Sequence, residues 1–347
     1  MKIGLVGYQG SGKSTLFEWL TGVTPDPALH HTAQSAMAAV PDERIEPLCG
    51  IYKPKKITMA SIELVDTPGL TRSHEGNAAR LALIREAGAL VLVVAAFGGA
   101  DPLVDLATFR EDLLLADLEI VTGRVERLRE SLKKPKVGRE NEQAELAALE
   151  PMLAALEASK PLAMSEMNEE QLKATRSFRL LTEKPTMVLV NTADDESKPE
   201  RFTSQPARAD STPAVPISAA SVGLQVELAR MSAEDRAEFL KEMHVAGIDR
   251  DALLRAVMDA SGQFLYFTAG EKEVRTWMLF KGGTALDAAA NVHTDLARGF
   301  IRAEVMACAD LIRLGSEREI KAHNLLRQEP KHYIVKDGDV LFIKSGV

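Results

Sequence analysis

Cysteine, aromatic residues and long apolar runs are all scarce in this 347-residue chain. Its two cysteines, Cys49 and Cys308, form neither a disulfide framework nor a zinc site by themselves. Aromatic residues make up 5% of the chain, which argues against an aromatic-rich all-β fold. No stretch reaches the roughly 18 apolar residues of a membrane span, and the start of the chain lacks the apolar segment of a secretory signal. We therefore expect a cytoplasmic protein without a membrane partner.

The rest of the composition is that of an ordinary globular protein, with 46% hydrophobic and 27% charged residues. The net charge of −8 excludes a broadly cationic nucleic-acid coat, and we expect no DNA partner. The charge is unevenly distributed. Residues 264–347 contain 12 Lys and Arg against 11 Asp and Glu, a net charge of +1, so the first 263 residues carry the remaining −9. Contact with RNA is therefore electrostatically easiest in the C-terminal stretch.

Five short apolar runs alternate with stretches of helical composition, at residues 2–6, 57–65, 89–97, 186–191 and 214–219. This alternation predicts an α/β fold with a mainly parallel sheet. After residue 263 the pattern changes to that of a small mixed domain. There, Asp337-Gly338 between two apolar runs predicts a β-hairpin.

Between the third and fourth apolar runs, leucine and valine recur at spacings of three and four residues. They do so over 114–132 and again over 146–156, on either side of a turn at 133–140. Two such seams around one turn predict an antiparallel helical hairpin. The alternative is that these leucines are buried against the sheet. Pro151 lies in the second seam, where we expect a kink or a helix break.

Residues 7–14, GYQGSGKS, match the phosphate-loop pattern G-x-x-x-x-G-K-[ST] in full, between an expected strand and an expected helix. The glycines let backbone N–H groups turn toward phosphate oxygens. Lys13 would neutralise the β- and γ-phosphates, and Ser14 would contribute to a Mg²⁺ shell. The alternative is a glycine turn with a chance Lys-Ser. The predicted phosphate-binding residues are Gly7, Gly10, Ser11, Gly12, Lys13, Ser14 and Thr15.

Asp66-Thr67-Pro68-Gly69 follows the second apolar run, about fifty residues after the phosphate loop. At the end of a strand, this D-x-x-G pattern indicates an aspartate that holds Mg²⁺ through water and a glycine amide that senses the γ-phosphate. A surface turn is the alternative. We predict that Lys13, Asp66 and Gly69 carry the chemistry of the site, with Ser14 and Asp66 as metal ligands.

Asn191-Thr192-Ala193-Asp194 follows the fourth run, where G proteins place the N-K-x-D motif that reads the base. The Asp194 carboxylate can accept hydrogen bonds from the N1–H and N2–H₂ groups of guanine, although Thr192 stands where a lysine normally packs on the base. Ser218 and Ala219 follow the fifth run, where we expect the next base-contacting loop. Each of these two signals is weak by itself.

Taken together, these motifs resemble those of the YchF/Obg-like NTPase family, a branch of the translation-factor class of P-loop GTPases. Residues 267–305 and YIVKDGDVLFI are very similar to the TGS domain of that family, and DTPGL, IREAGAL and LTEKPTMVLVN match in order. The resemblance implies a G domain at 1–105 and 181–263, a helical insert at 106–180, and a ubiquitin-like β-grasp TGS domain at 264–347. It also implies binding of Mg²⁺ with GTP or ATP, slow hydrolysis and association with the ribosome or another RNA-rich partner. We expect a monomer.

The chain departs from the family pattern at several positions. Gly10 stands where the family usually has the asparagine expected to help bind K⁺, and Leu70 occupies the position of the water-orienting glutamine of Ras-like proteins. Thr32 is the candidate for the switch threonine that senses Mg²⁺. Asp194 replaces the glutamate linked to tolerance of ATP. Because no water-orienting side chain is apparent, the alternative is a non-hydrolysing, nucleotide-dependent module that binds RNA or the ribosome.

Overall fold

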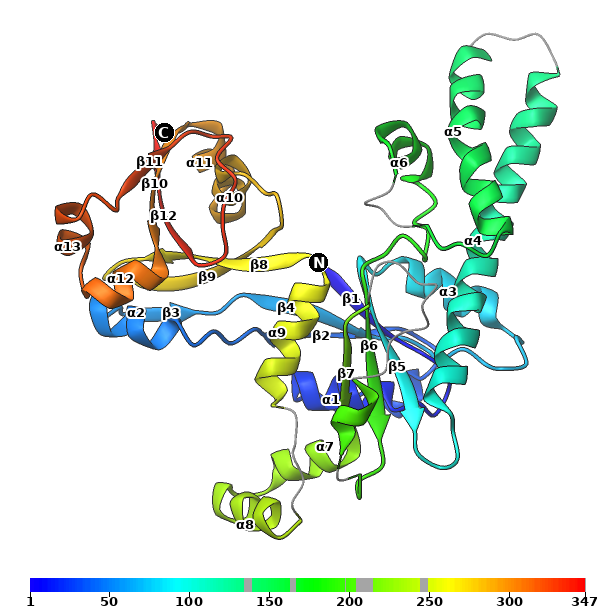
Figure 1. Cartoon of the computed structure of the whole chain (residues 1–347), viewed down its shortest axis with the longest axis horizontal. Coiled ribbons are helices and arrows are strands. Elements are labelled where there is room, and N and C mark those ends of the chain that lie inside the picture. Colours follow the sequence, from blue (N-terminus) through cyan, green and yellow to red (C-terminus); the bar gives the residue numbers. More distant parts are fainter. Residues whose placement is uncertain (134–138, 163–166, 197, 204–214, 244–248, 347) are drawn as a thin grey trace. The chain divides into compact units, whose positions relative to one another are not determined.

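The computed structural model describes the chain except residues 134–138, 163–166, 197, 204–214, 244–248 and 347 (Figure 1). The chain divides into two compact units. Unit 1 comprises Met1–Ala36 and Glu63–Arg250, and unit 2 comprises Met37–Ile62 and Asp251–Val347. Unit 2 therefore contains an N-terminal segment that the sequence patterns did not group with the C-terminal stretch. The division into a G domain, a helical insert and a TGS domain stays a prediction.

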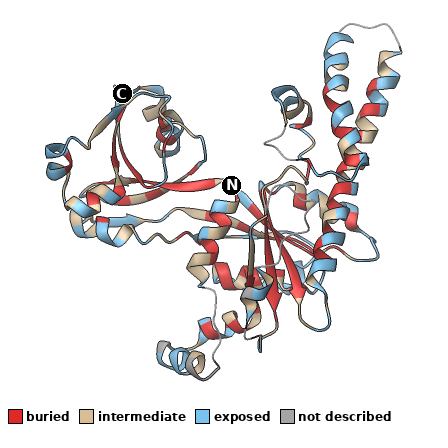
Figure 2. Ribbon diagram, in the orientation of Figure 1, coloured by how far each residue is buried: buried red, intermediate tan, exposed pale blue. Residues whose placement is uncertain are grey.

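The core of unit 1 is a six-stranded sheet in the order β2-β4-β1-β5-β6-β7. The pairings of β1 with β4 and β5, of β5 with β6, and of β6 with β7 are all parallel. The predicted mainly parallel α/β sheet is therefore confirmed. Figure 2 shows how completely the central strands are buried, as expected of apolar runs covered on both faces. The strands are β1 (Lys2–Val6), β2 (Gln34–Ala39), β4 (Ser61–Asp66), β5 (Ala89–Ala96), β6 (Thr186–Thr192) and β7 (Ile217–Ala220).

The apolar run at 57–65 forms two strands instead of one. Its first residues form β3 (Lys56–Thr58), which pairs with a strand of unit 2, and its last residues form β4. The chain leaves the first strand at Ala60, whose N–H donates to Thr276 Oγ1 at 2.7 Å. The pairing of β3 ends at Thr58, and the residues of this one run belong to two sheets.

Helices α3 (Asn77–Arg85) and α4 (Pro102–Leu132) pack on one face of the unit 1 sheet, where Ile84 and Phe109 join the cluster of buried residues around Leu92 and Val190. Helix α1 (Lys13–Thr21) packs against α7 (Val222–Arg230). Across the described residues, no helix combines the length and the apolar character that a bilayer span requires. The remaining helical segments of unit 1 are η1 (Pro27–Leu29), α6 (Glu169–Thr175), η3 (Pro199–Phe202) and α8 (Ala233–Met243).

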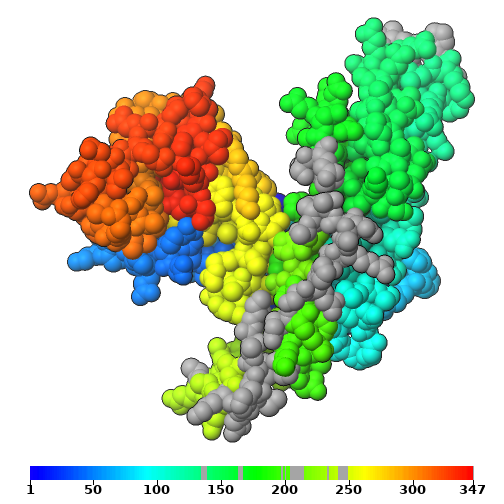
Figure 3. Space-filling view, viewed as in Figure 1, coloured from blue at the N-terminus to red at the C-terminus, as the bar shows by residue number. Residues whose placement is uncertain are grey.

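The predicted helical hairpin is formed by the later part of α4 and by α5 (Arg139–Glu157). In the space-filling view it projects from the rest of unit 1 (Figure 3). Val121, Val125 and Leu128 of α4 are buried with Leu149 and other residues of α5 in a separate cluster. The alternative, in which the seam is buried against the sheet, is wrong for these residues. Most of the predicted turn lies outside the described residues. Helix α5 continues through Pro151, so of the two predicted outcomes the helix break is wrong and the kink stays a prediction.

Unit 2 contains a mixed six-stranded sheet in the order β11-β10-β12-β8-β9-β3, with buried clusters around Phe267 and Tyr266. Its remaining strands are β8 (Gln263–Ala269), β9 (Glu273–Phe280), β10 (Phe300–Ala307), β11 (Arg327–Glu329) and β12 (Asp339–Ser345). Its helices are α2 (Ile45–Tyr52), α10 (Ala285–Val292), α11 (Thr294–Arg298), α12 (Cys308–Leu314) and α13 (Glu317–Ala322), and α9 (Arg250–Ala260) begins at the boundary between the units.

The hairpin predicted around Asp337-Gly338 is wrong. Strand β12 starts directly after Gly338, but the preceding run forms only an isolated bridge, between Ile334 and Thr284. The Asp339 carboxylate explains the difference, because it accepts hydrogen bonds from the Lys336 N–H at 2.9 Å and from the Tyr333 hydroxyl at 2.8 Å. These bonds close a local turn instead of a strand ladder.

Candidate functional site

The loop from Gly7 to Ser14 connects β1 to α1, and two of its glycines are required by close contacts. Gly7 has a φ of +147°, and a Cβ there would lie 2.3 Å from the Val93 carbonyl oxygen. Gly12 has a φ of +96°, and a Cβ there would lie 2.1 Å from Asn191 Nδ2. A side chain at either position would displace its neighbour, so the phosphate-loop pattern corresponds to a loop that only glycine can build here.

Lys13 lies at the start of α1 with 6% of its surface exposed. Its Nζ donates a hydrogen bond to the Tyr8 carbonyl oxygen at 2.8 Å. Burial lowers the pKa of the Lys13 ammonium to about 8, and the nearby Asp66 carboxylate opposes that shift. A buried ammonium with a single opposing carboxylate is well suited to receive an anionic ligand.

Asp66, at the end of β4, is joined to the phosphate loop through Ser14, whose Oγ donates to Asp66 Oδ2 at 2.6 Å. Burial raises the pKa of the Asp66 carboxyl, although the Ser14 hydrogen bond and the Lys13 charge oppose the rise. Its other oxygen, Oδ1, is buried without a hydrogen-bond partner among the described residues. A hydroxyl beside a carboxylate with an unused buried oxygen fits a divalent cation that prefers oxygen ligands.

Gly69 lies close to Lys13, because a Cβ at this glycine would stand 2.7 Å from the lysine Nζ. The sequence-predicted residues Lys13, Asp66 and Gly69 are thus brought together. They line one cavity of about 530 Å³, a volume typical of small-molecule sites. The predicted residues Gly10, Ser14, Thr15 and Thr32 also line this cavity.

Thr32 reaches the cavity from the turn after η1, and its hydroxyl donates to the Leu29 carbonyl oxygen at 2.9 Å. Its role toward a metal stays a prediction. The sequence patterns missed Arg80, which lines the same cavity from α3. The Arg80 guanidinium donates to the Glu75 carbonyl oxygen at 2.9 Å. Arg80 is one of several charged residues on α3 and belongs to no nucleotide-binding motif, so the sequence carries no local signal of this placement.

At the other end of the site, Asn191 connects the phosphate loop to α7. Its Nδ2 donates to the Ser11 carbonyl oxygen at 3.0 Å, and its Oδ1 accepts from the Val222 N–H at 3.0 Å. The exposed Asp194 carboxylate accepts hydrogen bonds from the Ser221 hydroxyl and from the Leu224 N–H. Asp194 is therefore fixed at the start of α7, where a negative charge is favourable.

Ser218 and Ala219 lie within β7, paired with Leu189 and Val190 of β6, so the prediction that they form a loop after the strand is wrong. Strand pairing begins only at Pro216, whose carbonyl oxygen accepts from the Val188 N–H. A proline has no N–H to donate, which places it at the start of a strand. The loop therefore comes later in the chain, and Ser221 is the residue that contacts Asp194.

Two family models match the chain. A model described as a 50S ribosome-binding GTPase matches residues 2–127. The model of the C-terminal part of YchF GTPases, described as a protein of unknown function (DUF933), matches residues 264–345. The two matches fall on either side of the hairpin helix α5, in the order that the sequence motifs predict.

Relatives of known name match over the full chain. A protein of Haemophilus influenzae named ribosome-binding ATPase YchF is 35% identical, covering 100% of this chain and 99% of the relative. A protein of Oryza sativa named Obg-like ATPase 1 is 33% identical, covering 100% of this chain and 92% of the relative. The solved structure of the Schizosaccharomyces pombe YchF GTPase superimposes with a TM-score of 0.82 at 28% identity, over 99% of this chain and 97% of that one.

Proposed function

Because this chain belongs to the YchF family of P-loop nucleotide-binding proteins, we propose that it binds GTP or ATP with Mg²⁺ and hydrolyses the nucleotide slowly. The observation that carries the proposal is the arrangement of Lys13, Ser14 and Asp66 around one cavity. These residue types, in this order after parallel strands, are those that bind a nucleoside triphosphate and its metal ion.

Different residues of the cavity would bind the phosphates and the metal ion. The Lys13 ammonium would exchange its bond to the Tyr8 carbonyl for phosphate oxygens, and the backbone N–H groups of residues 10–14 would complete the cradle. Ser14 and Asp66 would hold Mg²⁺, and the buried Oδ1 of Asp66 supports this assignment. When bound, the ion neutralises negative charge on the phosphates.

Slow hydrolysis follows from the residue after the D-x-x-G motif. Leu70 is fully buried, and its backbone forms a bridge with Tyr8. An apolar side chain directed into the core cannot orient an attacking water. This observation also favours the alternative, a nucleotide-dependent binding module that does not hydrolyse.

Asp194 supports a guanine preference, since its carboxylate is exposed and fixed in place by Ser221 and Leu224. Thr192, however, is buried and replaces the lysine that would pack on the base. We therefore expect GTP and ATP both to bind, with only a modest preference for GTP.

We further propose that the protein acts in the cytoplasm as a monomer on the ribosome or another RNA-rich partner, with neither DNA nor a membrane as partner. The names of the relatives and the charge of residues 264–347 support this. Arg298 and Arg302 are exposed basic residues in that stretch. Co-sedimentation with ribosomes should weaken steeply with rising salt, and Arg298→Glu with Arg302→Glu should weaken it at low salt. Binding that resists both changes would place the contact elsewhere, the α4–α5 hairpin being the next candidate.

The test of the catalytic proposal is single-turnover release of γ-phosphate from GTP and ATP, measured in parallel with Mg²⁺ and with a chelator. We expect slow release that requires Mg²⁺ and is lost in Lys13→Ala. Binding of nucleotide without release from either would establish the non-hydrolysing alternative.

A further inference from the structure

Helix α4 has three buried aspartates: Asp105 in its first turn, and Asp112 and Asp117 in its interior, where aspartate is a poor helix former. Each is paired with a basic residue from the segment 70–85, which runs from the D-x-x-G motif to the end of α3. Because all three buried carboxylates contact the same segment, they link α4 to residues 70–85.

The first contact lies next to the phosphate loop. The Arg72 guanidinium donates to both oxygens of Asp105, at 2.7 and 2.8 Å. Its Cζ also lies 4.8 Å from the centroid of the Tyr8 ring. Arg72 therefore contacts α4 and the phosphate loop at the same time, three residues after Gly69.

The second contact centres on Asp112, two helical turns further along α4. The Tyr8 hydroxyl donates to Asp112 Oδ2 at 2.8 Å, and His74 Nδ1 lies 3.4 Å from Asp112 Oδ1. Tyr8 also packs edge-on against Phe109 of α4, with ring centroids 5.4 Å apart. A residue of the phosphate loop is thus bonded directly to the helix that continues into the hairpin.

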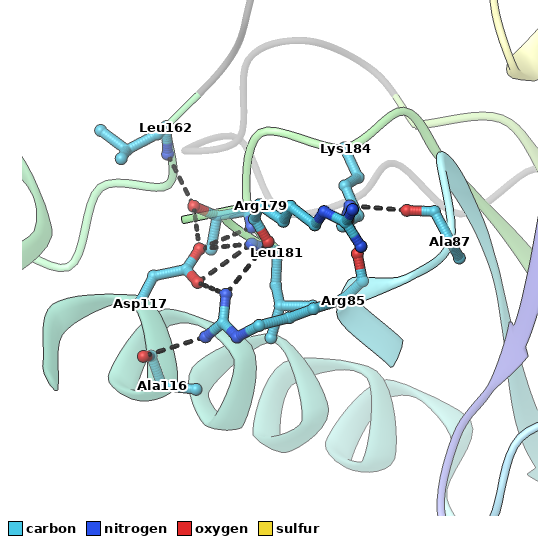
Figure 4. A network of polar contacts seen from close by, with 9 residues as sticks. Arg85, Ala87, Ala116, Asp117, Leu162, Arg179, Leu181 and Lys184 are labelled. Carbon is cyan, nitrogen blue, oxygen red and sulfur yellow. Dashed lines mark hydrogen bonds and ion pairs between the residues drawn. The ribbon is translucent and has the colours of Figure 1, made fainter. Parts of the chain in front are cut away.

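The third contact is at the other end of α3 (Figure 4). The Arg85 guanidinium donates to Asp117 Oδ1 at 2.7 Å and to the Ala116 carbonyl oxygen at 3.1 Å. Asp117 is fully buried and also accepts from the backbone N–H groups of Leu181 and Thr182. It therefore joins α3 to both the outgoing and the returning chain at the base of the hairpin.

The segment after Gly69 is also bonded to the phosphate loop itself. The Leu70 N–H donates to the Gly7 carbonyl oxygen at 3.1 Å, and the Gln9 N–H donates to the Leu70 carbonyl oxygen at 3.0 Å. A displacement of Gly69 would therefore also shift the segment 70–85. The three aspartates connect that segment to α4.

We propose that Asp105, Asp112 and Asp117 are positioning residues that fix the segment 70–85 on α4, so that the nucleotide state at Gly69 is passed to the α4–α5 hairpin. This inference rests on the proposed nucleotide binding. The inference goes beyond nucleotide binding because it assigns the α4–α5 hairpin, and not only the loops of the site, as an element that responds to the bound nucleotide. Allostery of this kind requires an element that both sites bias.

The test is hydrogen exchange of the full chain, measured with Mg²⁺ alone, with Mg²⁺ and GDP, and with Mg²⁺ and a non-hydrolysable GTP analogue. In the unaltered protein we expect exchange in residues 102–157 to differ between the two nucleotides by about fivefold or more. Arg72→Gln should bind both nucleotides with nearly unchanged affinity by calorimetry but lose most of this difference, and Arg72→Lys should restore part of it.

Arg129→Gln is the matched control, because Arg129 pairs with Glu150 within the hairpin and contacts none of the three aspartates. It should keep the nucleotide-dependent difference. Persistence of the full difference in Arg72→Gln, or its equal loss in Arg129→Gln, would overturn the inference. Nucleotide binding without any response of the hairpin would overturn the inference alone, whereas absence of binding in the unaltered protein would overturn the proposed function as well.

Discussion

At the phosphate end of the site, the side chains of Lys13, at the start of α1, and Asp66, at the end of β4, are buried. At the base end, Asp194 is an exposed carboxylate held at the start of α7. The phosphate end is built from one continuous loop and the end of β4. The base end is assembled from residues that follow two different strands, β6 and β7.

This difference indicates which end of the site should determine the affinity for nucleotides and which the selectivity between GTP and ATP. Buried charged groups interact strongly with a ligand because water screens them little. An exposed carboxylate is screened by water, so a partner that it gains contributes less. The phosphate end should therefore supply most of the binding free energy, and the base end a small difference between nucleotides.

The largest expected effect is that of Lys13→Ala. Removal of the ammonium leaves only backbone N–H groups facing the phosphates, and hydrogen bonds to charged groups contribute about 1.5–3 kcal/mol each. Nucleotide affinity measured by calorimetry should fall at least about tenfold. Lys2→Ala, which removes an exposed lysine on β1, is the control. Equal affinity in Lys13→Ala and the control would refute the phosphate-loop assignment.

The next effect is that of Asp66→Asn, which keeps the shape of the side chain but removes the charge that would hold Mg²⁺. The unaltered protein should bind nucleotide more tightly with Mg²⁺ than with a chelator. In the variant this difference should shrink by about tenfold, the size of one charge-assisted interaction. A variant with the full Mg²⁺ effect would show that Asp66 is not part of the metal site.

A pH effect of similar size should come from Lys13. Its pKa is lowered to about 8 in the free protein, and bound phosphates favour the charged ammonium, so binding takes up a proton above pH 8. Affinity should therefore be nearly constant up to about pH 7, fall about twofold by pH 8 and about tenfold by pH 9. The fall should be absent in Lys13→Ala. Affinity that rises with pH would contradict the assigned direction.

At the base end, Asp194→Ala should weaken GTP by a few-fold, about 1 kcal/mol or less, and leave ATP nearly unchanged. Only guanine presents the paired N1–H and N2–H₂ donors that a carboxylate can accept. Competition of GTP and ATP for one fluorescent nucleotide measures both losses at once. Equal losses for the two nucleotides would show that Asp194 acts as a helix cap and does not read the base.

The smallest effect is that of Ser221→Ala, which removes the hydroxyl that donates to Asp194. The carboxylate would keep its bond from the Leu224 N–H, so the GTP preference should fall by about twofold or less. The same competition assay detects it. A loss as large as that in Asp194→Ala would mean that orientation by Ser221, and not the charge of Asp194, sets the preference.

The same contrast explains what the sequence could predict. The residues from Gly7 to Ser14 are contiguous and carry a complete pattern, and a parallel sheet brings Asp66 beside them without further information. Ser221 and the displaced Ser218 could not be placed, because their positions depend on where pairing with β6 begins. Residues 57–65 are divided between two sheets, and the first part pairs with β9, more than 200 residues away in the chain, which the local pattern does not encode. Buried carboxylates such as Asp117 have no periodic signal that distinguishes them from a solvated helix face.

The division of labour between the two ends of the site is tested most directly by calorimetric titration of the unaltered protein with GTP and with ATP, each with Mg²⁺ at the same pH and salt. We predict that both bind, with Kd values within about tenfold of each other, or about 1.4 kcal/mol, and that GTP binds more tightly. A preference of more than about a hundredfold for either nucleotide would contradict it, because the base end would then supply a larger share of the binding free energy than an exposed carboxylate can.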